Sequence, residues 1–106
     1  TVNNCTFEDS RVKSKGVLSV IGSTYYLTIS GCVFNNNNAT DSGAFGGALS
    51  LDFTNSLNSP IVVSGCKFTN NNAGNGAGIY INVAGVSLVN CNFTSNTATT
   101  QGGGLY

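Results

Sequence analysis

Short runs of alternating apolar and polar residues recur along this chain, and each run leads into a Cys-x-Phe triplet. The triplets pair Cys5 with Phe7, Cys32 with Phe34, Cys66 with Phe68, and Cys91 with Phe93. The apolar residues that alternate just before them are Val2, Leu27 and Ile29, Ile61 and Val63, and Val86 and Leu88. Such alternation predicts β-strands with one buried face, and its recurrence predicts a repeat protein.

Turn-forming residues separate these strands at equivalent places in every copy. Immediately before the cysteines stand Asn4, Gly31, Gly65 and Asn90. Glycine and asparagine enter the left-handed region of the backbone most easily, so we expect a sharp bend there. Five residues after the cysteines, a second corner is expected at Ser10, Asn37, Asn71 and Asn96. Glycine-rich turns at Gly16, Gly46, Gly76 and Gly102 then lead into a further alternating strand.

Each repeat is therefore predicted to hold three short strands, with no helical periodicity between them. This organisation is typical of an all-β parallel β-helix, or solenoid, in which each strand pairs with its equivalent in the next coil. We expect about four coils, near residues 1–31, 32–65, 66–90 and 91–106, in one segment. A β-sandwich also uses short strands, but it does not need the same residue type at the same turn four times.

The motif Cys-x-Phe-x-x-Asn-x-Ala followed by Gly-Gly-Ala-Leu resembles the repeats of right-handed parallel β-helix surface proteins. The likeness is to the passenger regions of polymorphic outer-membrane proteins and of similar autotransporter-like adhesins. It is carried by Phe34, Asn37, Gly46, Gly47, Ala48 and Leu49, and by Phe68, Asn71, Gly76, Gly78 and Ile79. The resemblance implies a right-handed coil and an extracellular, non-catalytic stalk or adhesin; it names no ligand.

Equivalent residues of stacked coils form ladders. The phenylalanine ladder is predicted to lie in the core, and the ladder of Asn37, Asn71 and Asn96 to bond through its amides to neighbouring backbone and to itself. The four cysteines fall on one ladder beside phenylalanine. We favour a column of buried thiols, because stacked side chains point the same way and a disulfide between them would be strained; disulfides are the alternative.

Charged residues are only 8% of the chain, with four Lys and Arg balancing four Asp and Glu. Because no basic field is available for phosphates, nucleic acid is not an expected partner. No long apolar run occurs, so neither a membrane span nor a signal peptide is expected within these residues. Histidine and Cys-x-x-Cys pairs are absent, so we expect no metal and no cofactor.

Catalysis is not expected either, because β-helix enzymes that cleave polysaccharides need clustered carboxylates. Asp41 and Asp52 fall in different parts of one coil. The mixed charges of residues 8–15 (Glu8, Asp9, Arg11, Lys13 and Lys15) are interpreted as a solvated patch of weak ion pairs.

Three Asn-x-Thr sequons begin at Asn4, Asn38 and Asn92. Asn92 lies between inward-facing Cys91 and Phe93 and must face outward, which makes it the best candidate for an N-linked glycan. Asn38 lies at a turn and is also expected to be accessible. Asn4 occupies the predicted bend and is the weakest of the three.

The sequence thus predicts a structural or adhesive segment of a surface stalk, fibre or filament. Neither end carries a capping segment, so the expected partners are further coils or other copies stacked end to end, together with surface glycans. The alternative is a carbohydrate-binding or pectate-lyase-like β-helix whose site lies outside these coils. Tyr80 and Tyr106, expected to face outward at equivalent positions, would be its visible sugar platform or would shield a sheet face.

Overall fold

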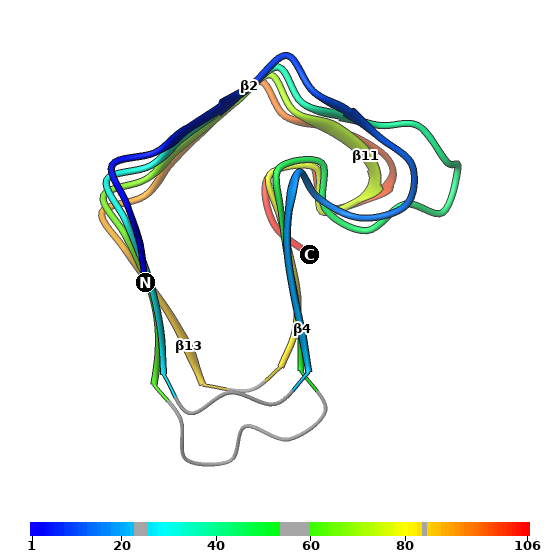
Figure 1. Ribbon diagram of the computed structural model, residues 1–106. Coiled ribbons are helices and arrows are strands. Elements are labelled where there is room, and N and C mark those ends of the chain that lie inside the picture. Colours follow the sequence, from blue (N-terminus) through cyan, green and yellow to red (C-terminus); the bar gives the residue numbers. More distant parts are fainter. Residues whose placement is uncertain (23–25, 54–59, 84) are drawn as a thin grey trace.

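The chain forms a solenoid of stacked coils in the computed structural model (Figure 1). The structure describes residues 1–22, 26–53, 60–83 and 85–106. Within these ranges the regular structure is entirely β-strand, without a helix, and the paired strands run parallel. The predicted all-β parallel β-helix is therefore confirmed.

Two of the sheets contain the strands that lead into and follow the cysteine bend. Sheet A holds β1 (Val2–Asn3), β5 (Leu27–Ser30), β9 (Ile61–Ser64) and β13 (Val86–Val89). Sheet B holds β2 (Thr6–Glu8), β6 (Val33–Asn35), β10 (Lys67–Thr69) and β14 (Asn92–Thr94). Both sets match the predicted strands.

The other two sheets complete each coil. Sheet C holds β3 (Arg11–Val12), β7 (Asn38–Ala39), β11 (Asn72–Asn75) and β15 (Thr97–Gln101). Sheet D holds β4 (Leu18–Gly22), β8 (Leu49–Phe53) and β12 (Ile79–Asn82), which follow the glycine-rich turns. The described chain passes through all four sheets three times and then through sheets A, B and C once more, in agreement with about four coils.

Sheet C corrects the prediction of three strands per coil. The sequence predicted only a corner where this fourth sheet lies, because β3 and β7 are two residues long and too short to show alternation. Asparagine, alanine and glycine are also poor strand formers. These short strands form because the neighbouring coils supply their backbone partners, as in the pairing of Arg11 with Asn38 and of Asn38 with Asn72.

The bend before each cysteine has the predicted left-handed backbone. The φ angles are 52° at Asn4, 61° at Gly31, 59° at Gly65 and 51° at Asn90. The second corner lies one residue earlier than predicted, since the positive φ angles fall at Asp9, Asn36, Asn70 and Ser95. Asp and Asn tolerate this region better than most residues, so the turn forms here and the following asparagine is free to point inward.

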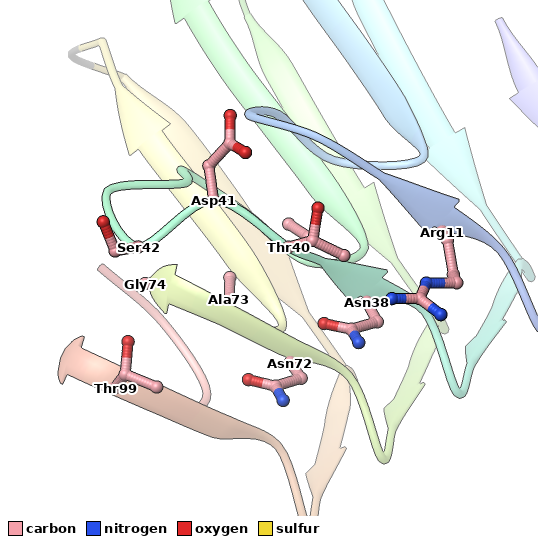
Figure 2. A pocket seen from close by; sticks show the side chains of 10 residues that line it. Arg11, Asn38, Thr40, Asp41, Ser42, Asn72, Ala73, Gly74 and Thr99 are labelled. Atoms are coloured by element: carbon pink, nitrogen blue, oxygen red, sulfur yellow. The ribbon is translucent and has the colours of Figure 1, made fainter.

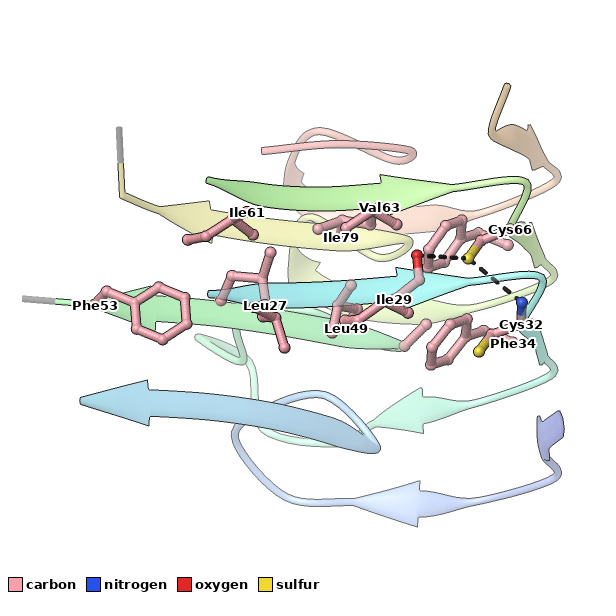
Figure 3. Close-up of a cluster of buried hydrophobic side chains, with 13 residues drawn as sticks. Leu27, Ile29, Cys32, Phe34, Leu49, Phe53, Ile61, Val63, Cys66 and Ile79 are labelled. Carbon is pink, nitrogen blue, oxygen red and sulfur yellow. Dashed lines mark hydrogen bonds between the residues drawn. The ribbon is translucent and has the colours of Figure 1, made fainter. Parts of the chain in front are cut away.

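The main core lies between sheets A, B and D, which surround one space when the solenoid is viewed along its axis (Figure 1). The predicted phenylalanine ladder fills part of it: successive rings of Phe7, Phe34, Phe68 and Phe93 lie 4.8 to 4.9 Å apart and nearly parallel. Aliphatic side chains from sheets A and D pack beside the rings (Figure 3). Phe34 and Phe68 are completely buried.

A second, smaller core lies in the side lobe that sheet C forms, on the right of Figure 1. Alanines fill it: Ala39, Ala44, Ala73 and Ala77, with Val12 and Ala98 packed against them. The glycine-rich turn closes this lobe by backbone contact. A Cβ atom at Gly47 would lie 2.6 Å from the carbonyl oxygens of Ala77 and Asn72, so no larger residue fits there. The Asn-x-Ala and Gly-Gly motifs of each repeat therefore form parts of the same side lobe.

Replacing a phenylalanine of the ladder should cost far more stability than replacing its outward neighbour. We expect Phe68→Ala to lower the free energy of unfolding by about 3 to 5 kcal/mol, because the ring is fully buried between two others. Lys67→Ala, at the exposed adjacent position, should change it by less than about 0.5 kcal/mol. Urea unfolding followed by circular dichroism measures both. Equal losses would show that the strand register is wrong.

Candidate functional site

The ladder of Asn37, Asn71 and Asn96 is an amide network that is buried at the first two residues and half-buried at Asn96. Nδ2 of Asn37 donates to Oδ1 of Asn71 at 3.0 Å, and Nδ2 of Asn71 donates to Oδ1 of Asn96 at 2.9 Å. Each amide also donates to the backbone carbonyl of a phenylalanine one coil away, at 2.8 to 3.0 Å. The predicted bonding is confirmed. Because these amides satisfy one another and the backbone, they have a structural role.

The cysteine column lies beside the phenylalanine rings, and all four thiols are free. The predicted burial holds for Cys32 and Cys66, which are completely buried. Cys91 is half-buried and Cys5 is exposed, because each lies on an outer coil with a neighbour on one side among the described residues. Sγ of Cys66 accepts the backbone N–H of Cys32 at 3.4 Å and donates to the carbonyl of Ile29 at 3.7 Å (Figure 3). Burial raises the pKa of the Cys66 thiol, which keeps it in the unreactive protonated form. In this environment the Cys66 thiol acts as a small hydrophobic side chain that donates one weak hydrogen bond.

Tyr80 and Tyr106 belong to an aromatic stack on the outside of the solenoid. Their ring centres lie 5.8 Å apart, and Phe45 lies 4.6 Å from Tyr80 on the preceding coil. Sequence reasoning missed Phe45, because it lies in the longer connection of the second coil. The ring of Tyr80 stacks on that of Tyr106 and lies against the tilted ring of Phe45, while Tyr106 stays about half exposed. Both the sugar platform and the shielding role that the sequence left open stay predictions.

The three sequons differ in their surroundings. Asn92 is exposed on the outer side of β14, and Oγ1 of Thr94 donates to its Oδ1 at 3.3 Å. Asn38 is half-buried on the outer face of β7. Asn4 lies at a bend with positive φ, and its backbone N–H is bound to the carbonyl of Ser30. Glycosylation of all three stays a prediction, with Asn92 the most accessible strand position.

The charged residues of the patch at 8–15 were expected to pair with one another within their loop, and the structure shows a different pairing. In the described ranges, the ion pair that forms runs between coils, from Nζ of Lys15 to Oδ2 of Asp52 at 3.0 Å. Asn82, one coil further, donates its amide to Oδ1 of Asp52 at 2.9 Å. The bond from Lys15, and then that from Asn82, hold the pKa of Asp52 below its ordinary value. This cluster joins three coils on the outside of sheet D.

A groove of about 480 Å³, lined by polar side chains together with Ala39, Ala73 and Gly74, lies on the outer face of sheet C (Figure 2). Arg11, Asn38 and Asn72 project into it from β3, β7 and β11, and Thr99 reaches it from β15. Its outer wall is the connection after β7, with Thr40, Asp41 and Ser42. A second depression of about 330 Å³ adjoins it and shares Arg11 and Asn38.

Sequence reasoning did not identify this groove. Its floor includes three residues that stand six positions after a cysteine, and this column of Arg11, Asn38 and Asn72 could have been found by alignment on cysteine. The wall could not, because it depends on how the longer connection of the second coil folds.

In the part of the chain that the structure describes, no three His, Cys, Asp or Glu side chains gather as a metal site would require. The same residues include no helix with the length and apolar character needed to cross a bilayer. The chain matches no protein-family model, no curated protein and no solved structure. The resemblance to surface-protein repeats therefore stays a prediction.

The inner thiols should be unreactive until the solenoid unfolds. We expect Cys32 and Cys66 to stay unmodified by iodoacetamide at pH 8 in the native protein, because both are buried and the pKa of Cys66 is raised. In urea without a reductant, both should react at the rate of an ordinary thiol. Peptide mass spectrometry reports the modified positions. Reaction that starts only after a reductant is added would show disulfides instead.

Proposed function

We propose that these coils form a structural or adhesive segment of an extracellular stalk, fibre or filament and that they contain no active site. The observation that carries the proposal is that the interior of the coils is filled by repeated side-chain ladders. Three ladders, of phenylalanine, asparagine and cysteine, run through successive coils and bond coil to coil. Contacts that repeat in every coil stabilise an elongated solenoid, and they do not create one reactive site.

The arrangement of carboxylates supports a non-catalytic role. Asp52 on β8 is bound to Lys15 and Asn82, and Asp9 accepts the amide of Asn36 at 2.8 Å. Asp41 lies in the connection after β7, on another side of the coil. Polysaccharide-cleaving sites need two or more carboxylates facing one bond. The runner-up, a carbohydrate-active β-helix with its site outside these coils, keeps the exposed ring of Tyr106 as a sugar platform, but the described residues bring no three acidic side chains together.

Further coils, or a second copy stacked end to end, are the partners that this proposal implies. The ladders support it, since one face of the half-buried rings of Phe7 and Phe93 has no aromatic neighbour among the described residues. A coil with the same motif would continue the phenylalanine stack there. For a eukaryotic source, the proposal includes a glycan at Asn92.

Immunolabelling tests the extracellular location. Antibodies raised against residues 1–106 should label intact, unpermeabilised cells of the source organism as strongly as permeabilised ones. An antibody to a cytosolic protein, which should label permeabilised cells only, is the control. Labelling by both antibodies only after permeabilisation would overturn the proposal.

A further inference from the structure

The groove on sheet C has a floor of evenly spaced hydrogen-bonding groups. Arg11 pairs in register with Asn38, and Asn38 with Asn72. Strands of neighbouring coils lie about 4.8 Å apart, so these outward side chains repeat at that interval along the axis. A chain molecule lying along the groove would meet a new polar group at each coil.

The wall of the groove is fixed by backbone hydrogen bonds. The N–H groups of Thr40 and Asp41 donate to the carbonyls of Val12 and Lys13, at 2.9 and 3.0 Å. The N–H of Ala44 donates to the carbonyl of Asp41 at 3.0 Å, and the carbonyl of Ala44 accepts the N–H of Asn75 at 2.8 Å. Because the wall is tied to the coils on both sides, the groove exists before any ligand arrives, which lowers the cost of binding.

The charged groups of the groove are available to a ligand. Within the described ranges, neither Arg11 nor Asp41 takes part in an ion pair. Arg11 offers up to five N–H donors, Asp41 offers acceptors, and the amides of Asn38 and Asn72 offer both. One positive and one negative group in a floor of amides and hydroxyls provide no net field for a charged polymer.

We propose that this groove binds a neutral oligosaccharide along the solenoid axis, with Arg11, Asn38 and Asn72 on its floor and Asp41 at its wall. Each sugar hydroxyl both donates and accepts a hydrogen bond, as the groups of the groove require. The volume lies in the range of small-molecule sites. The inference rests on the proposed surface location and names the class of ligand to which the segment would adhere.

The test uses the full natural chain, produced in a bacterial host without N-glycosylation so that Asn38 carries no glycan. The probe is an array of neutral gluco-, manno-, galacto- and xylo-oligosaccharides, followed by calorimetric titration with the sugar that binds best. Arg11→Ala should weaken binding by roughly tenfold or more, since a hydrogen bond to a charged group is lost. Asn72→Ala should weaken it about fivefold.

Lys67→Ala is the matched control, because Lys67 is an exposed cation on the same coil as Asn72 but on sheet B, outside the groove. It should leave the affinity unchanged. Circular dichroism should show that all three variants keep the native fold. The inference is overturned if no neutral sugar binds, or if Arg11→Ala and Asn72→Ala bind as tightly as the natural protein. Neither result would bear on the surface location, which immunolabelling tests separately.

Discussion

The parallel pairing of each strand with its equivalent one coil away is the constraint on which the rest of the structure depends. In this register a side chain meets the residue at its own position in the next coil, as Phe34 meets Phe68 and Phe68 meets Phe93. The residues at one position must therefore be compatible with copies of themselves. Phenylalanine satisfies this by ring stacking. Asparagine satisfies it because its amide carries both a donor and an acceptor.

The same constraint explains why so few residues are charged. Two like charges facing each other on neighbouring strands repel. Where the register involves a charged residue, its partner is uncharged: Lys67 faces Val33 and Asn92, and Asp52 faces Ile21 and Asn82. In these pairs, like charges do not face each other across neighbouring coils. Recognition on such a solenoid has to come from outward side chains and from connections of unequal length, as in the groove on sheet C.

The repeated features were predictable from the sequence, and the features present in one coil were not. The Cys-x-Phe triplets predicted sheets A and B, and the Gly or Asn before them predicted the bends at Gly31 and Gly65. A pattern that occurs in all four repeats indicates the same local structure in each. Sheet C escaped because β3 and β7 are two residues long and because β11 and β15 lack an alternation of large apolar and polar residues. Phe45, the Lys15–Asp52 pair and the groove wall escaped because each depends on how one particular connection folds back on its neighbours.

A double-mutant cycle across the asparagine ladder tests most directly the claim that stability lies in contacts between equivalent residues. Asn37→Ala, Asn71→Ala and the double variant would be unfolded in urea, and the free energies of unfolding compared. Nδ2 of Asn37 donates to Oδ1 of Asn71 at 3.0 Å, so the account predicts a coupling of about 0.5 to 3 kcal/mol. Strictly additive losses would contradict it.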